Sequence, residues 1–215
     1  MGSLTSLSKQ ELEDFLINQT NIEYEGSKLY DGTGTHMNQN PYELSELIEW
    51  IRHLAPNYNP KTLLEIGFST GITNTILNKV FDFDNITAID HVSLGGIANP
   101  STFLANLKFK PINLIAGDST EKNTFNRVKA LGPYNLLFID GGHTQEILRS
   151  DYANYTRLLT KNSVTIIHDI QSAAFPALSD VWKEIKSKLP ANAEVKEFIR
   201  GQAKISLGIG AIYNP

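Results

Sequence analysis

Two short segments of the sequence place acids and imidazoles directly after apolar runs. In YNLLFIDGGHT, the apolar run ends in Asp140, two glycines and His143. In SVTIIHDI, a second run ends in His168 and Asp169. Carboxylates that meet an imidazole at one point suit a divalent cation. A cluster of hydrogen bonds that pins two loops together is the alternative interpretation.

A glycine-containing turn follows an earlier apolar run, in LLEIGFSTGITN. Gly67 and Gly71 enclose three residues, with Ser69 in the middle, and a helical pattern follows. Glycine lets the backbone approach a ligand closely, and a helix N-terminus offers unpaired N–H groups with a partial positive charge. A plain connection between strand and helix can look the same, so this turn indicates a cofactor site only together with other residues.

Polar residues also follow the next two apolar runs. Asp90 lies 19 residues beyond the glycine turn, where an acid can accept hydrogen bonds from both ribose hydroxyls of a nucleoside. His91 beside it is either a cofactor contact or an ordinary loop residue. Asp118 and Ser119 end the third run, where they can hydrogen-bond an adenine edge. Capping of the next helix by Ser119 or Thr120 is the alternative.

Five apolar runs, separated by helical stretches, must position these residues. Near-continuous apolarity is typical of strands buried on both faces of a parallel sheet. The predicted strands cover residues 62–66, 86–89, 112–116, 135–139 and 163–167. The predicted helices cover about residues 71–81, 100–107, 120–131, 145–159 and 176–188. This alternation predicts an α/β fold with a doubly wound sheet, whose fourth and fifth strands are adjacent and whose ligands bind at the carboxyl ends of the strands.

The flanking regions add one helix and one hairpin. In NPYELSELIEWIRHL, Asn40 can cap a helix, Pro41 suits its first position, and an apolar stripe follows. Residues 194–199 and 206–213 are strand-like and have no helix between them. They predict an antiparallel hairpin at one edge of the sheet.

Length and composition limit the kind of protein and its partners. A chain of 215 residues, 41% hydrophobic and with a net charge of −4, predicts one domain, residues 1–215, with no basic surface for nucleic acid. No cysteine is present, which excludes disulfides and thiolate zinc sites. No signal peptide or membrane span is recognisable, so we expect a soluble, cytoplasmic protein. Its assembly state is left open, a homo-oligomer included.

The glycine turn, the ribose acid and the adenine-side pair together describe a nucleoside cofactor site. In order and spacing they resemble the class I S-adenosylmethionine-dependent methyltransferases, over about residues 38–213. EIGFSTG is similar to their first motif, in which an acid on the strand, here Glu65, precedes G-x-x-x-G and belongs to the cofactor site. The resemblance implies a mostly parallel, seven-stranded sheet with an antiparallel strand inserted at its end. A nicotinamide-binding turn would more usually show G-x-G-x-x-G, which GFSTGI lacks.

The ends of the fourth and fifth strands resemble a metal-dependent O-methyltransferase branch of this family, which includes the catechol and macrolide-sugar enzymes. There an acid ends the fourth strand, an acidic or amide pair ends the fifth, and a basic residue three positions after the first acid removes the substrate proton. The resemblance implies that Asp140, His168 and Asp169 bind Mg²⁺ or Mn²⁺, that Asp140 also adjoins the cofactor, and that His143 is the base. His168 departs from the pattern, because an acid is more usual there; it either ligates a softer metal such as manganese or points away.

Two positions are possible for the side chain of His143. Gly141 and Gly142 precede it, and their freedom of φ would let the chain fold back so that the imidazole faces the acceptor. Alternatively, His143 caps the helix that begins near Thr144. In the resembling enzymes the N-terminal segment covers the site, which implies that residues 1–40 form a cap. The candidate acceptor contacts in that segment are Tyr30, His36, Met37 and Gln39.

The expected function is S-adenosylmethionine-dependent, metal-assisted O-methylation of a small-molecule hydroxyl. Two alternatives stand beside it. An oxidoreductase or hydroxylase could use the same scaffold, because fold alone does not fix the reaction. A non-catalytic nucleoside-binding module would share the cofactor site and lack the chemistry.

Overall fold

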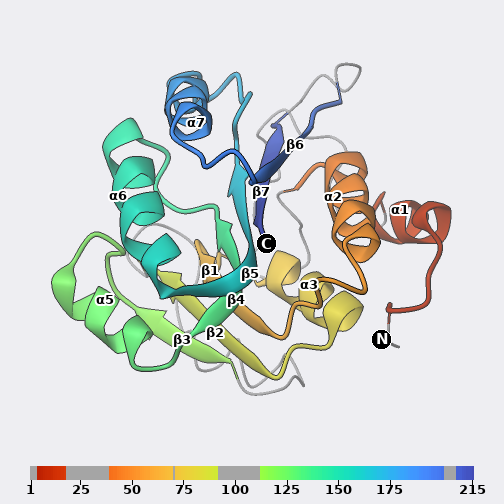
Figure 1. Cartoon of the computed structure of the whole chain (residues 1–215), viewed down its shortest axis with the longest axis horizontal. Coiled ribbons are helices and arrows are strands. Elements are labelled where there is room, and N and C mark those ends of the chain that lie inside the picture. Colours follow the sequence, from red (N-terminus) through yellow and green to blue (C-terminus); the bar gives the residue numbers. More distant parts are fainter. Residues whose placement is uncertain (1–3, 18–38, 70, 92–111, 201–206) are drawn as a thin grey trace.

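The computed structural model describes residues 4–17, 39–69, 71–91, 112–200 and 207–215 (Figure 1). Its elements, in chain order, are α1 (Lys9–Ile17), α2 (Pro41–His53), β1 (Thr62–Ile66), α3 (Ile72–Phe81), β2 (Asn85–Asp90), β3 (Asn113–Ala116), α5 (Lys122–Lys129), β4 (Tyr134–Ile139), α6 (Gln145–Tyr155), the 3₁₀ turn η2 (Thr156–Leu158), β5 (Leu159–His168), α7 (Leu178–Ser187), β6 (Glu194–Phe198) and β7 (Ile209–Asn214). Within these residues no helix is both long and apolar enough to cross a bilayer.

The seven strands form one mixed sheet with the order β3-β2-β1-β4-β5-β7-β6. The five strands from β3 to β5 are parallel, whereas β7 runs antiparallel to both of its neighbours. The predicted α/β class, the adjacency of the fourth and fifth strands, and the antiparallel hairpin at the sheet edge are therefore confirmed. The β7 strand is the one inserted, since it lies between β5 and β6.

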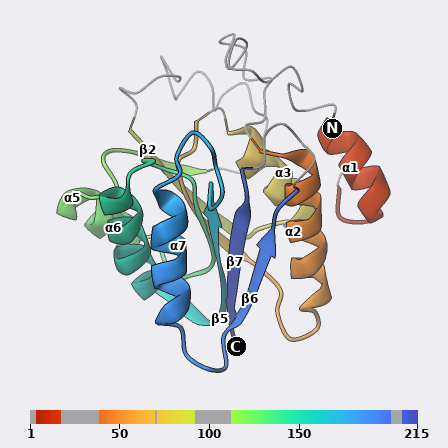
Figure 2. The same ribbon diagram turned by 90° about the horizontal axis from the view of Figure 1, so that it is seen from above.

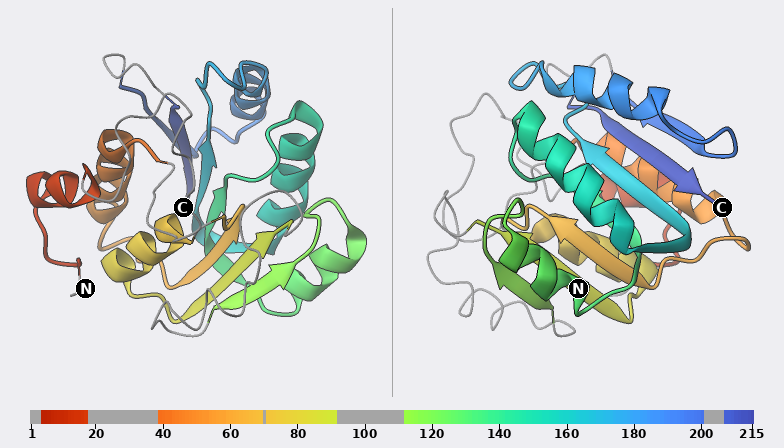
Figure 3. Two further views of the ribbon diagram at one scale, coloured as in Figure 1. Left: turned by 180° about the vertical axis from the view of Figure 1, so that it is seen from behind. Right: turned by 60° about the vertical axis from the view of Figure 1, so that its left-hand side comes forward.

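Helices cover both faces of the sheet. Figure 2 shows α5, α6 and α7 on one side and α2 and α3 on the other, with α1 outside α2. The two views of Figure 3 show the same separation. A sheet covered in this way must bury both faces, and side chains along a strand alternate between them. Leu63 accordingly packs with the core under α2 and α3, whereas Leu64 and Ile66 pack with the core under α6 and α7.

The predicted start of α2 is confirmed. The Asn40 side chain accepts hydrogen bonds from the backbone N–H groups of Tyr42 and Glu43, and Pro41 occupies the first turn. Two N–H groups at the helix N-terminus are satisfied in this way, and the first helical position needs no partner because proline has no N–H.

The buried Glu43 in the first turn of α2 connects this helix to the hairpin. Its carboxylate accepts hydrogen bonds from the backbone N–H of Arg200 at 3.1 Å and from that of Gly208 at 2.9 Å. These two residues lie on either side of the connection between β6 and β7. A buried carboxyl group needs such hydrogen-bond donors, so these two bonds tie the hairpin to α2.

Helix α1 was not expected. Ser8 and Glu11 form a capping box, in which the Glu11 carboxylate accepts from the Ser8 N–H at 2.9 Å and the Ser8 hydroxyl accepts from the Glu11 N–H at 3.3 Å. Leu12 and Leu16 are fully buried in the core that includes α2. The S-x-x-E pattern and the i, i+4 leucines were the available signal. That residues 1–40 form a cap over the site stays a prediction.

The remaining boundaries differ in one place for a clear reason. The helix predicted over residues 145–159 ends at Tyr155, and β5 begins at Leu159. The first residues of β5 are partly or fully exposed, so no apolar run marks them. The helix predicted over residues 100–107 lies outside the described residues.

Candidate active site

The register of the sheet brings the predicted residues to one level. Ile66 at the end of β1 pairs with Ile89 of β2 on one side and with Ile139 of β4 on the other. Ile139 in turn pairs with Ile167 of β5. The next residue of each strand therefore lies at the same carboxyl edge, as expected for a ligand site in such a sheet. These next residues are Gly67, Asp90, Asp140 and His168.

The two glycines of the first turn are needed for different reasons. Gly67 has a φ of 93°, and a Cβ atom there would lie 1.8 Å from the carbonyl oxygen of Asp140. Its absence lets the β1 turn rest directly on the β4 loop. Gly71, with a φ of 74°, is the N-cap of α3 and provides no side chain. The turn thus leads into a helix N-terminus that has no side-chain cap, which suits a cofactor site of this kind.

Asp90 is tied to the same turn. Its Oδ2 atom accepts a hydrogen bond from the Ser69 N–H at 2.6 Å, and Ser69 has a left-handed φ of 45°. The acid at the tip of β2 and the turn after β1 are therefore held together. A carboxylate can accept several hydrogen bonds, so this contact leaves capacity for ribose hydroxyls. The ribose role of Asp90 stays a prediction.

Glu65 lies in β1, two residues before Gly67. Its side chain is buried on the α3 side of β1, and Oε2 accepts a hydrogen bond from the Asn74 amide at 2.7 Å. Burial raises the pKa of this carboxyl well above its usual range, and the Asn74 bond offsets only part of that effect. The observed contact ties β1 to α3, and a direct cofactor contact stays a prediction.

The adenine-side residues lie at the end of β3. The Asp118 Oδ1 atom accepts from the Thr120 N–H at 2.8 Å and from its hydroxyl at 2.6 Å, and these bonds lower the Asp118 pKa. His91 is exposed and near enough for its charge to lower that pKa further. The capping alternative is wrong, because the N-cap of α5 is Glu121. Ser119 accepts from the Tyr155 hydroxyl through its carbonyl oxygen at 2.8 Å.

His168 is enclosed between the two acids at the ends of β4 and β5. Its Nδ1 atom lies 3.0 Å from Asp140 Oδ1 and 3.6 Å from Asp169 Oδ2, and its Nε2 atom is buried without a hydrogen-bond partner. Burial alone would lower the pKa of His168. The charge of Asp140 and the contacts with both acids outweigh it and raise the pKa to about 10. The two acids therefore favour the protonated form of the His168 ring.

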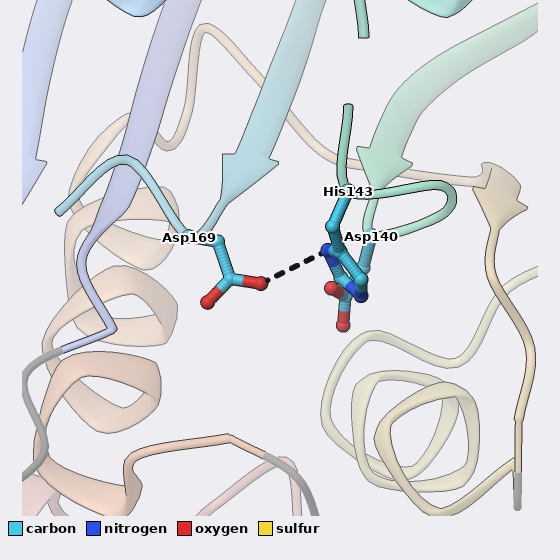
Figure 4. Close-up of side chains that lie close together, drawn as sticks. All are labelled: Asp140, His143 and Asp169. Atoms are coloured by element: carbon cyan, nitrogen blue, oxygen red, sulfur yellow. Dashed lines mark ion pairs between the residues drawn. The ribbon is translucent and has the colours of Figure 1, made fainter. Parts of the chain in front are cut away.

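His143 reaches back from the loop after β4 to the end of β5. Its Nδ1 atom lies 3.2 Å from Asp169 Oδ2, as Figure 4 shows, and its ring stacks on Phe175. Burial opposes protonation, but the bond to Asp169 and the charges of Asp140 and Asp169 raise the His143 pKa. Asp169 has its pKa lowered, because the contacts with both histidines outweigh its burial.

Two predictions about the loop after β4 are wrong: that His143 caps the next helix, and that the loop uses the freedom of φ at Gly141 and Gly142. The N-cap of α6 is Thr144, whose hydroxyl accepts from the Ile147 N–H at 3.3 Å. Neither Gly141 nor Gly142 has a positive φ. A Cβ atom at Gly141 would lie 3.0 Å from the Ile66 side chain, and one at Gly142 would lie 2.6 Å from that of Ile147. These glycines give space, and the backbone does not use their conformational freedom.

The residues that could hold a cation differ from the expected set in one member. One ligand atom each of Asp140, His143 and Asp169 lies within 4.8 Å of the other two. Two carboxylates and an imidazole at this spacing fit a divalent ion. His168 lies beside the same acids, but its Nδ1 atom contacts them and its Nε2 atom is enclosed.

Gln39 joins the site from the segment before α2. Its buried side-chain amide donates a hydrogen bond to Asp140 Oδ2 at 2.8 Å. A residue expected at the acceptor thus contacts the first acid of the site. The other expected contacts in this segment, Tyr30, His36 and Met37, lie outside the described residues.

Two residues near the site were missed by sequence reasoning. Phe175, in the segment between β5 and α7, stacks on His143 with a centroid separation of 4.1 Å. Asp151 on α6 is fully buried, and its carboxyl group has at most a weak contact with Ser119. No spacing rule connects Phe175 to His143. An acid within the mostly polar α6 segment looks like a surface residue.

A comparison with known families agrees with this geometry. Residues 64–170 match the family model described as a methyltransferase domain, from β1 to just beyond Asp169. The chain contains a methyltransferase domain. The matched residues include the glycine turn, Asp90 and Asp118, together with the acids and histidines at the ends of β4 and β5. No curated protein sequence matches the chain.

Solved structures of methyltransferases share the fold. A candidate caffeoyl-CoA O-methyltransferase from Staphylococcus aureus is 19% identical with a TM-score of 0.62, covering 98% of this chain and 93% of its own. TomG, an O-methyltransferase from Streptomyces achromogenes, is 12% identical with a TM-score of 0.58, covering 79% and 80%. MycE, from the mycinamycin biosynthetic pathway, is 16% identical with a TM-score of 0.53, covering 77% of this chain and 48% of its own.

Proposed function

We propose that this methyltransferase domain transfers the methyl group of S-adenosylmethionine to a hydroxyl oxygen of a small molecule, with His143 as the general base. The observation that carries the proposal is the His143–Asp169 pair beside Asp140, at the edge of a methyltransferase sheet. The molecules bound in similar solved structures support this proposal. TomG was solved with S-adenosylmethionine, and MycE with magnesium, S-adenosylhomocysteine and mycinamycin VI.

The cofactor is assigned to the turn after β1 and its neighbours. The N-terminus of α3 has Gly71 as its N-cap and no side-chain cap, and Asp90 stands at the tip of the next strand. An acid in this position suits the two ribose hydroxyls, and the end of β3 with Asp118 suits the adenine. These residues orient the methyl donor toward the ends of β4 and β5.

The base is prepared by Asp169. Because His143 Nδ1 faces the Asp169 carboxylate, its Nε2 atom is the nitrogen left to accept a proton from the acceptor hydroxyl. The deprotonated oxygen then attacks the methyl carbon in line, the O–C bond forms as the C–S bond breaks, and S-adenosylhomocysteine leaves. The proton remains on Nε2 until solvent takes it. Alignment of two bound reactants can contribute roughly 7–11 kcal/mol to such a step.

A divalent cation is part of the proposal, with Asp140 and Asp169 as its carboxylate ligands. When bound, a divalent cation lowers the pKa of a hydroxyl that it contacts. The 4.8 Å grouping of Asp140, His143 and Asp169 fits such an ion. The chain provides the carboxylates and fixes one of them through Gln39. We further propose that the protein works in the cytoplasm.

Calorimetric titration separates this proposal from its rivals. We expect S-adenosylmethionine to bind and NAD not to bind. Transfer of the labelled methyl group to a hydroxyl in a panel of sugars, phenols and macrolides should follow. Tight NAD binding without S-adenosylmethionine binding would favour an oxidoreductase, and binding without any transfer would favour a nucleoside-binding module.

A further inference from the structure

The imidazole of His143 is held on its edge and on its face. At the edge, Nδ1 lies 3.2 Å from Asp169 Oδ2. On the face, the Phe175 ring lies parallel to it, with centroids 4.1 Å apart and planes inclined by 11°. A single hydrogen bond leaves the ring free to swing about that contact, whereas a stacked face fixes its plane. Together the two contacts determine where Nε2 points.

Both contacts come from one short segment of chain. After Asp169, the backbone makes successive turns in which the Ser172 N–H donates to the Asp169 carbonyl at 3.3 Å and the Phe175 N–H donates to the Ser172 carbonyl at 3.3 Å. The Leu178 N–H continues the series by donating to the Phe175 carbonyl at 3.0 Å. Phe175 is thereby placed by the same turns that begin at Asp169.

A third link joins this segment to the loop that carries His143. The side-chain amide of Gln145, two residues after His143, donates to the Ala177 carbonyl at 2.9 Å. Phe175 is itself half-buried against the core under α6 and α7. The aromatic face beside His143 is therefore anchored on both sides, by the core under α6 and α7 and by the loop that carries His143.

We propose that Phe175 is a positioning residue, which fixes the plane of the His143 ring so that Nε2 is directed at the acceptor hydroxyl. The placement of the ring stands on the geometry alone; its catalytic meaning rests on the proposed function. Near-attack geometry is sensitive to displacements on the order of 1 Å, so a freely turning base would lose much of its effect. The role belongs to the aromatic face, and any residue that provides one should serve.

The test uses the full-length chain with isotopically labelled histidine and the variants Phe175→Leu, Phe175→Met and Phe175→Tyr. The His143 Hε1 resonance is identified by its disappearance in His143→Gln. In the wild type it should be shifted upfield by the ring current of Phe175. We expect Phe175→Leu and Phe175→Met to abolish this shift and Phe175→Tyr to retain it. Two non-aromatic variants keep the test decisive if one of them does not fold.

A turnover measurement extends the test to catalysis. With any hydroxyl acceptor that the wild type methylates, Phe175→Leu should lower kcat by about tenfold or more, a fraction of what a general base contributes. The affinity for S-adenosylmethionine should not change, and Phe175→Tyr should restore kcat. An unchanged His143 resonance in a folded Phe175→Leu or Phe175→Met variant would overturn the inference. Correct resonance shifts in a protein that transfers no methyl group would overturn the proposed function instead, and leave the placement of the ring intact.

Discussion

Asp169 Oδ2 lies 3.2 Å from His143 Nδ1, so an acid at the end of β5 orients an imidazole that belongs to the loop after β4. The same carboxylate lies 3.6 Å from His168 Nδ1. The buried Asp169 thus contacts two histidines. His143 is exposed, whereas His168 is buried. This arrangement influences the pKa of His143.

The first prediction concerns the pKa of His143 in the metal-free protein. Burial lowers it, but the Asp169 bond and the charges of Asp140 and Asp169 raise it, with a net result above 6.5. Asp169→Asn removes one charge and should lower the pKa, so that the neutral base appears at lower pH. Histidine NMR titration measures this directly. Asp180→Asn, at an exposed position on α7, is the control and should change nothing; an unmoved His143 titration in Asp169→Asn would contradict the account.

The second prediction concerns the cofactor. Asp90→Ala should weaken S-adenosylmethionine binding by roughly 1.5–3 kcal/mol, as expected for lost hydrogen bonds to a charged group. Asp84→Ala, at an exposed position just before β2, is the matched control and should bind normally. Calorimetry on both variants decides the matter. If folded Asp90→Ala keeps the wild-type dissociation constant, Asp90 is not the ribose ligand.

The third prediction concerns the cation. Exhaustive chelation should abolish methyl transfer and leave most of the affinity for S-adenosylmethionine, because in the proposed site Asp140 and Asp169 bind the cation beside the acceptor, whereas the glycine turn binds the cofactor. Activity should return on addition of Mg²⁺ or Mn²⁺, and both are tested because an imidazole accompanies the carboxylates. Full activity in the chelated enzyme would remove the cation from the mechanism and leave His143 alone to activate the acceptor.

The fourth prediction concerns Asp151, whose buried carboxyl has a pKa raised to about 7, chiefly by desolvation. Its ordinary value of 3.8 applies in the unfolded chain, so the unfolded state releases the proton first. Below about pH 4 the carboxyl is protonated in both states, and Asp151 does not reduce the free energy of unfolding. As the pH rises through about 7 this free energy falls by up to ~4 kcal/mol, because the folded state must then bury a carboxylate.

Asp151→Asn should therefore raise the free energy of unfolding more at pH 8 than at pH 4. Urea denaturation at both pH values measures the difference. Asp84→Asn should show no such pH dependence, because that side chain is exposed. Equal effects of Asp151→Asn at the two pH values would mean that Asp151 is ionised in the folded protein at neutral pH.

The sheet and its edge were predictable because buried parallel strands leave a clear pattern. TLLEI and NLLFI are apolar enough to mark β1 and β4, and their paired ends put Gly67 beside Asp140. Helix α1 went unrecognised although its capping box was present in the sequence. The first residues of β5 could not be predicted as a strand, because they are partly or fully exposed and form no apolar run.

Side-chain partners were predictable only where topology forces them together. Asp140 and Asp169 had to meet, since adjacent parallel strands deliver them to one edge. The choice between His143 and His168 depended on how far each ring is enclosed, which the sequence does not encode locally. Gly141 and Gly142 were assigned the wrong physical reason, because lack of a Cβ atom and freedom of φ look identical in a sequence. Phe175 depends on three successive turns that no motif announces.

The most direct test of the account is the rate of methyl transfer by His143→Ala. The variant should fold and bind S-adenosylmethionine as the wild type does, but kcat should fall at least about a hundredfold, the lower end of what a general base contributes. His53→Ala, which removes an exposed imidazole at the end of α2, should keep wild-type turnover. A folded His143→Ala enzyme with near wild-type kcat from pH 6 to 9 would show that His143 is not the base.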